Sequence, residues 1–167
     1  KIMFELVTEY GYASSGESFS IADEYEVWIM EMISKGCETV WDKQQKKFIN
    51  RNKGAVWVAI RIPDGYVSAH ANHARITNFK LSDGKTSINS DEINKIFNPD
   101  VEIVYAADVI SFAKSQGYFN GQDSDFSFAE AYAPINYGAA RFCELRVWAM
   151  FNEIHDDIQK YWEHACG

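Results

Sequence analysis

The sequence lacks several features that would quickly place it in a class. It has no run of eighteen apolar residues, so it offers no candidate for a bilayer-spanning segment. Basic side chains are the minority, 16 against 24 acidic ones, and the formal charge of −8 argues against nucleic acid as a partner because phosphates would be repelled. It contains no internal repeat, no P-loop, and no G-x-S-x-G or G-x-G-x-x-G motif. Phe, Tyr and Trp are abundant (11, 9 and 5), which excludes a disordered tail.

Cysteine is also scarce. The three cysteines, Cys37, Cys143 and Cys166, are far apart and form no C-x-x-C pair, which argues against a disulfide scaffold or a cysteine zinc site. They do not fix the compartment, so the localisation stays open. Cys143 falls on the apolar stripe of a predicted helix, which favours core packing over a nucleophilic role. We expect no metal and no cofactor.

The length of 167 residues allows one domain with a real core. The chain begins at Lys1 without the charged and apolar pattern of a signal segment, and helical periodicity runs close to both ends. We therefore interpret 1–167 as a single partial domain, an internal portion of a longer protein.

Hydrophobic periodicity predicts an α+β fold with antiparallel strands and helices on a sheet face. The predicted elements are a helix ending at Gly11, strands at 17–23, 26–33, 55–62 and 66–71, a helical turn at 91–96, and helices at 106–116, 127–131 and 137–165. Apart from the helical turn at 91–96, residues 78–98 are predicted to form a loop. The polar, locally basic stretch 36–54 is interpreted as a hairpin or loop insertion, across which Trp41 and Phe48 are placed to pack together.

Two residues stand out on chemical grounds. Asn72 follows a predicted strand beside small residues, and its amide is able to donate to an oxyanion. The alternative is that Asn72 only favours a turn. Arg141 follows Gly138-Ala139-Ala140, so its guanidinium would be free to hold a substrate carboxylate. Its alternative is a surface ion pair.

The stretch from Val58 to Ile76, VAIRIPDGYVSAHANHARI, resembles a block of the N-terminal-nucleophile cysteine dipeptidases, the dipeptidase A family that is related to secernin. Similar blocks follow one another across the chain, at 14–23, 26–31, 109–113 with 117–119, 125–128, and 140–148. The basic stretch around 43–53 does not match.

The resemblance implies an αββα sandwich of the Ntn-hydrolase kind, with two antiparallel sheets between helix layers. It also implies hydrolysis of dipeptides by a cysteine at the mature N-terminus, whose own α-amine acts as base while the thiolate forms an acyl-enzyme. The matching blocks do not include that cysteine. We therefore expect the nucleophile to lie outside this chain, and the chain alone to be inactive.

The resemblance also assigns supporting roles. It places Asn72 near the oxyanion and Arg141, in Ala-Arg-Phe, close to the nucleophile, where a cation would favour the thiolate. His70, His73 and Arg75 are candidates for lining the substrate pocket. The histidines are three apart, yet without an H-E-x-x-H helix they do not predict a metal site.

Other predictions remain open. Glu31 is a carboxylate in a strand with two apolar faces, so it needs a partner, and an arginine would supply one. The same fold also supports an amidase or acyltransferase acting on non-peptide amides, and a non-catalytic ligand-binding domain is a third alternative. Strand edges left unpaired in the excerpt would pair with the remainder of the parent chain or form a homodimer.

Overall fold

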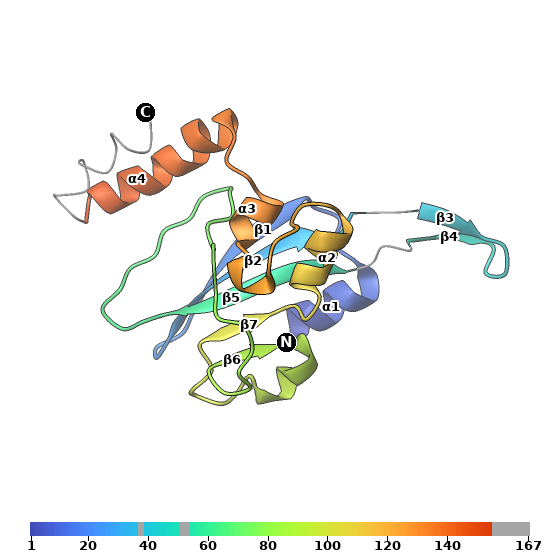
Figure 1. Ribbon diagram of the computed structural model, residues 1–167, viewed down its shortest axis with the longest axis horizontal. Coiled ribbons are helices and arrows are strands. Elements are labelled where there is room, and N and C mark those ends of the chain that lie inside the picture. The colour runs from blue at the N-terminus through green and yellow to red at the C-terminus, as the bar shows by residue number, and fades with distance from the viewer. Residues whose placement is uncertain (37–38, 51–53, 155–167) are drawn as a thin grey trace.

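The computed structural model describes residues 1–36, 39–50 and 54–154 (Figure 1). The strands are β1 (Gly16–Ala22), β2 (Val27–Ser34), β3 (Thr39–Asp42), β4 (Lys47–Asn50), β5 (Ala55–Ile62), β6 (Ser87–Asn89) and β7 (Ile103–Tyr105). The helices are α1 (Ile2–Tyr10), α2 (Val109–Ser115), α3 (Phe128–Tyr132) and α4 (Leu145–Asn152), with short 3₁₀ helices η1 (Ser90–Lys95) and η2 (Asp123–Asp125) and a π-helical segment η3 (Ala139–Glu144).

Five strands form one sheet in the order β1-β2-β5-β7-β6. The neighbours β1, β2, β5 and β7 are antiparallel, whereas β6 runs parallel to β7. Strands β2 and β5 lie inside the sheet and carry apolar side chains on both faces, so both faces must be covered. The prediction of an α+β fold is confirmed, and the complete αββα sandwich stays a prediction.

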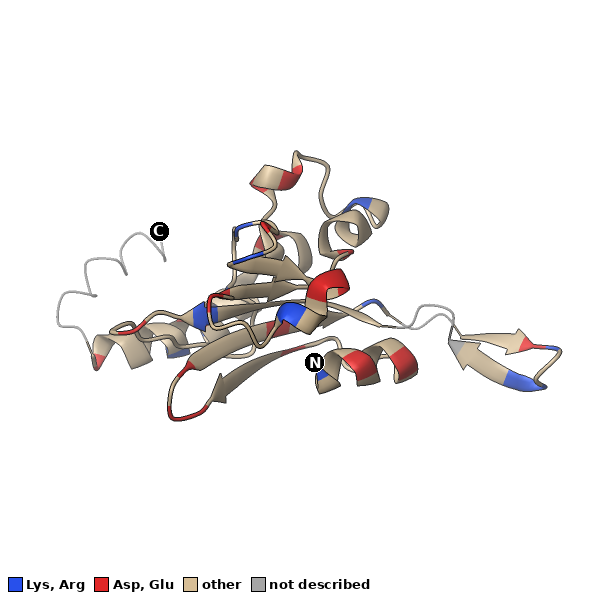
Figure 2. Cartoon of the chain, turned by 90° about the horizontal axis from the view of Figure 1, so that it is seen from below, with Lys and Arg blue, Asp and Glu red and all other residues tan. Residues whose placement is uncertain are grey.

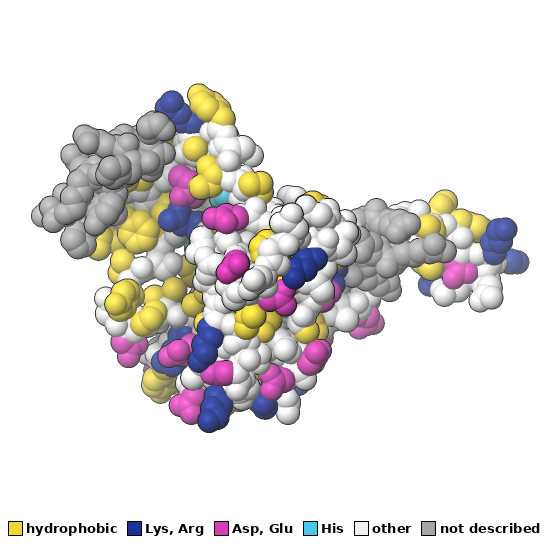
Figure 3. Space-filling model, in the orientation of Figure 1, with side chains coloured by type: hydrophobic (Ala, Val, Ile, Leu, Met, Phe, Trp, Pro, Cys, Tyr) yellow, Lys and Arg dark blue, Asp and Glu magenta, His cyan; other side chains and the backbone are white. Residues whose placement is uncertain are grey.

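The helices cover the two faces of this sheet. Phe4 of α1 packs edge to face against Trp57 of β5, with ring centroids 5.6 Å apart, and α1 lies along one side of the sheet in Figure 2. Helices α2 and α3 lie on the other face, where Phe128 and Val109 are fully buried (Figure 1). Acidic and basic side chains are interspersed over the face seen in Figure 3, so that face carries no large patch of one sign.

The predicted strand at 66–71 is wrong. This segment forms no ladder, and its end shows only an isolated bridge between Ala71 and His73. The reason is that both edges of β5 are already occupied, one by β2 and the other by β7. The segment therefore runs across the sheet face instead of joining it.

Strands β6 and β7 were not predicted, and β6 falls inside the stretch expected to be loop. Each has only three residues, too few for alternation to be recognised in the sequence. Tertiary pairing defines them: β7 pairs with β5, where Ile103 faces Ile60 and Tyr105 faces Val58, and β6 pairs with β7.

The helical predictions hold for the described residues with shifted bounds. The turn at 91–96 is η1, the helix at 106–116 is α2, and that at 127–131 is α3. The long predicted helix is present as η3 and α4 and ends at Asn152, since Glu153 and Ile154 form a turn. The part predicted for 155–165 lies outside the described residues, as do Cys37 and Cys166. Among the described residues, no helix is both long and apolar enough to span a membrane.

Strands β3 and β4 form a separate two-stranded hairpin that projects from the body of the molecule (Figure 1). Trp41 and Phe48 face each other across it, with ring centroids 5.1 Å apart, as expected. That this hairpin is an insertion stays a prediction.

Candidate functional site

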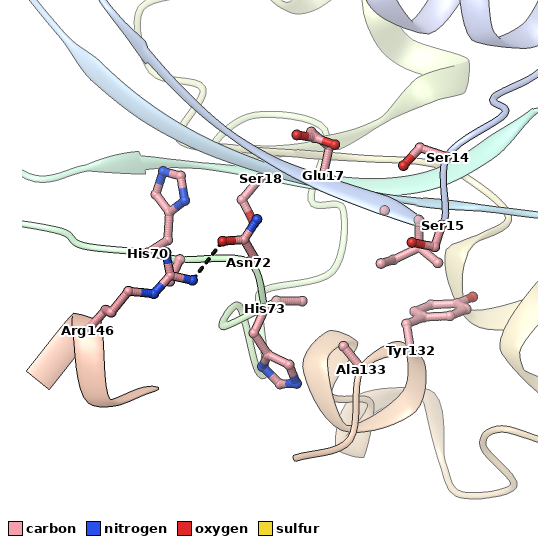
Figure 4. Close-up of a pocket in the computed structure, with 14 residues that line it drawn as sticks. Ser14, Ser15, Glu17, Ser18, His70, Asn72, His73, Tyr132, Ala133 and Arg146 are labelled. Atoms are coloured by element: carbon pink, nitrogen blue, oxygen red, sulfur yellow. Dashed lines mark hydrogen bonds between the residues drawn. The ribbon is translucent and has the colours of Figure 1, made fainter. Parts of the chain in front are cut away.

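A cavity of about 690 Å³ opens beside the edge strand β1 (Figure 4). Three parts of the chain build its wall: the approach to β1 and its first residues, the irregular segment 70–74, and the end of α3, with Arg146 reaching in from α4. The polar side chains that line it are Ser14, Ser15, Glu17, Ser18, His70, Asn72, His73, Tyr132 and Arg146. Its volume is in the range of small-molecule sites.

Hydrogen bonds hold the segment that carries Asn72. The two residues at the C-terminal end of this segment donate backbone N–H groups to Glu31 of β2. The N–H of Arg75 donates to Oε1 at 2.6 Å, and the N–H of Ile76 donates to Oε2 at 2.9 Å. Beyond them, α3 donates the N–H groups of Phe128 and Ala129 to the carbonyl oxygens of Thr77 and Ile76. The chain is thus fixed over the sheet although it joins no ladder.

Asn72 is exposed to the cavity, and its amide has a defined orientation. The guanidinium of Arg146 donates from Nη2 to Oδ1 of Asn72 at 2.7 Å (Figure 4). A guanidinium only donates, so its partner on Asn72 must be the carbonyl oxygen. The Nδ2 group is thereby left as a donor turned towards the β1 side of the cavity.

Arg146 itself is steadied by its own helix, because its Nε donates to the carbonyl oxygen of Phe142 at 2.5 Å. The arginine predicted from the sequence, Arg141, is exposed and does not line the cavity. Its guanidinium lies over the ring of Tyr137, 5.5 Å from the centroid. Sequence reasoning missed Arg146, although it lies in the same family-like block, five residues further on.

The two histidines line the cavity in different ways. His70 bonds through Nε2 to Oγ of Ser20 at 2.7 Å, which ties the start of the segment to β1. His73 has both ring nitrogens buried, and neither finds a partner among the described residues. Buried nitrogens without partners are costly, and a polar ligand group would reach them only if the side chain turned towards the cavity.

Arg75 does not line this cavity. Its side chain forms an ion pair with Glu144, the last residue of η3, and borders a neighbouring hollow of about 200 Å³. The cavity therefore brings together Asn72, His70 and His73 of the predicted site residues, and places Arg75 and Arg141 outside it.

The cavity supplies hydrogen-bond donors, the positive charge of Arg146 and the negative charge of Glu17. Cys143 is 8% exposed and does not line it, in agreement with the expected core packing. Within the described residues, no group of three His, Cys, Asp or Glu side chains is arranged to hold a metal ion. The donors of Asn72 and Arg146 are suited to stabilise negative charge on a substrate oxygen.

The sequence of the chain is similar to a class of peptidases. The family model of peptidase family C69 matches residues 1–165, and the chain belongs to this family. It is similar to a probable dipeptidase of Salmonella dublin, 23% identical over 95% of this chain and 28% of that protein. It is also similar to a probable dipeptidase of Latilactobacillus sakei, 22% identical over 96% of this chain and 26% of that protein. The chain thus spans about a quarter of the length of these relatives. No solved structure matches it.

Proposed function

We propose that this chain is an internal part of a dipeptidase, and that the Nδ2 group of Asn72 stabilises the oxyanion formed when the peptide bond is attacked. The observation that carries the proposal is the bond from Arg146 to Oδ1 of Asn72, which leaves Nδ2 as a donor facing the cavity. A donor oriented before the reaction needs no reorganisation as charge develops on the carbonyl oxygen.

We further propose that the nucleophile is an N-terminal cysteine in the part of the protein beyond these 167 residues. Its α-amine would take the thiol proton, and the thiolate would attack the carbonyl carbon of the peptide bond. The C–N bond would then break as the protonated α-amine gives its proton to the leaving amine, and water would hydrolyse the remaining thioester and release the thiol. The positive charge of Arg146 next to Asn72 would favour the thiolate. Arg141 stays a second candidate for that electrostatic role. On this proposal the chain is inactive alone.

The substrate we propose is a dipeptide. Membership of a peptidase family and the two relatives support a small peptide, and the cavity offers polar contacts from all three parts of the chain that line it. His73, with two ring nitrogens that lack partners within the described part of the chain, is the residue we expect to contact a polar group of the substrate.

The free edge of β1 supports the proposal that the remainder of the parent chain packs here. Strand β1 pairs with β2 on one side and with no described strand on the other, directly beside the cavity. Open strand edges recruit further strands. A homodimer through this edge is the competing outcome, and the oligomeric state of the full-length protein distinguishes the two.

The test uses the full-length protein that contains this chain, assayed on a panel of dipeptides and of acylated non-peptide amides. Hydrolysis of the dipeptides, lost when the N-terminal cysteine is replaced by alanine, is the expected result. Asn72→Ala should lower kcat by roughly a hundredfold. The matched control is Asn98→Ala, because Asn98 accepts the N–H of Asp100 in an exposed turn elsewhere. Cleavage restricted to the non-peptide amides would instead indicate an amidase, and an unchanged kcat would reduce Asn72 to a turn residue.

A further inference from the structure

Glu31 is an unusual residue for its position. It lies in the middle of β2, opposite Ser18 of β1 and Val58 of β5, in a strand whose neighbouring side chains are apolar. Its exposed fraction is 1%, which makes it one of the most buried side chains of the described chain. Burying a carboxylate is expensive unless its oxygens find donors.

Both oxygens of Glu31 do find donors, and these are consecutive backbone N–H groups rather than side chains. Arg75 donates at 2.6 Å and Ile76 at 2.9 Å, one to each oxygen. The carboxylate thus supplies the acceptors that a neighbouring strand would otherwise offer to these residues. An apolar side chain at this position would fill the space but would leave both N–H groups without these acceptors.

We propose that Glu31 is a positioning residue for Asn72, because it clamps the backbone of Arg75 and Ile76 and thereby fixes the segment that presents the Asn72 amide to the cavity. This inference rests on the proposed function for its effect on catalysis. It goes beyond that function because it assigns the position of the Asn72 amide to Glu31, a residue that does not line the cavity of about 690 Å³.

The contacts on either side of Asn72 explain why this clamp matters. Before Asn72, His70 is tied to Ser20 of β1, and after it Arg75 is tied to Glu31. Among the residues that the structure describes, only Arg146 binds the side chain of Asn72, through an exposed contact. Between two fixed points five residues apart, the backbone has little freedom, so the amide keeps its direction. Releasing one point would let it drift, and a misplacement of about 1 Å is able to cost a hundredfold in rate.

The charge environment of Glu31 shows the cost of burying this carboxyl group. Burial raises its pKa above the usual 4.5, while the two N–H groups, His70 and the Arg75 guanidinium act in the opposite direction. The site therefore accepts a desolvation cost in order to hold two strong acceptors at this point of the sheet.

The first test measures catalysis in the full-length protein with Glu31→Gln, which keeps the shape but replaces one acceptor oxygen by an amide NH2 group, a donor that faces an N–H group. We expect kcat to fall roughly ten- to a hundredfold, with KM changed less than about threefold. The matched control is Glu92→Gln, since Glu92 binds Ser82 and Lys95 far from the cavity. In an Asn72→Ala background, Glu31→Gln should have almost no further effect on kcat. Independent, multiplicative losses would overturn the positioning role.

The second test does not depend on activity, and so separates this inference from the proposed function. The Arg75 and Ile76 amides should be strongly protected from hydrogen exchange in the full-length protein. In Glu31→Gln, the amide that then faces the NH2 group should lose that protection, while the amides of β2 and β5 keep theirs. Unchanged protection at the two amides would refute the clamp even if dipeptides are hydrolysed. If Glu31→Gln does not fold, Glu31→Asp, which withdraws the carboxylate by one methylene, must show the same local loss.

Discussion

Two arginines five residues apart allow the reasoning about the site to be tested directly. Arg146 contacts Asn72 at 2.7 Å, whereas Arg141 lies over Tyr137 outside the cavity. A hydrogen bond from a charged donor contributes about 1.5–3 kcal/mol, and exposure of Arg146 reduces this to about 1 kcal/mol. Since a tenfold change in rate corresponds to about 1.4 kcal/mol, loss of the oriented Asn72 amide in Arg146→Gln should lower kcat about five- to tenfold.

The assay is steady-state dipeptide hydrolysis by the full-length protein, with Arg146→Gln, Arg146→Lys and Arg141→Gln compared at one pH. Arg146→Lys keeps the charge but loses the planar fork, so we expect an intermediate kcat. The double variant Arg146→Gln with Asn72→Ala should be no slower than Asn72→Ala alone, apart from any separate effect of the charge on the thiolate. A fall in kcat with Arg141→Gln, together with an unchanged Arg146→Gln, would refute the assignment of Arg146 and restore Arg141.

Three further predictions concern stability and binding. His73→Phe should raise KM for dipeptides while the melting temperature is kept or raised, because it removes two buried nitrogens without partners in the described chain; a lower melting temperature with unchanged KM would show a purely structural histidine. Gly16→Ala should lower the free energy of unfolding by about 1 kcal/mol in chemical denaturation. An added Cβ would lie 2.7 Å from Cδ1 of Ile33 and 3.1 Å from the carbonyl oxygen of Met32. An unchanged free energy of unfolding would mean that the sheet edge moves to accommodate the methyl group without cost. Lys80 and backbone N–H groups of the same turn hold the pKa of Asp83 well below its usual 3.8. The ionised Asp83 side chain therefore stabilises the fold fully at pH values above 3.8, and this stabilisation is lost as the pH falls towards the pKa of the folded state. The difference in free energy of unfolding between the wild type and Asp83→Asn should therefore be largest at neutral pH and shrink on acidification, and a constant difference would contradict this.

The long elements of the fold could be predicted because their periodicity is strong. Strands β2 and β5 each extend over eight residues that are mostly apolar, and their positions agree with the prediction within one residue at each end. The hairpin contact between Trp41 and Phe48 was also predictable, because cross-strand pairing follows from local register. The strand expected at 66–71 failed because strand character depends on a free neighbouring edge, and β7 had taken it.

The candidate site was predictable in part. Asn72, His70 and His73 were selected from the sequence and do line one cavity. Arg146 was missed because the sequence says which residues share a helix, but not which of them reaches a loop more than seventy residues earlier in the chain. For Glu31 the sequence indicated only that a buried carboxylate needs a partner, and an arginine was expected. Arg75 does supply that partner, but through its backbone N–H rather than its guanidinium.

The sequence by itself determined the class of fold, the buried strands, the acidic surface charge and the family, because these depend on composition, on periodicity and on blocks of neighbouring residues. The tertiary structure alone decided which strands pair, which arginine contacts Asn72, and how a segment without a ladder is held over the sheet. The physical reason is that hydrogen bonds between distant residues depend on which edges and donors the rest of the fold leaves free, and no local pattern contains that information.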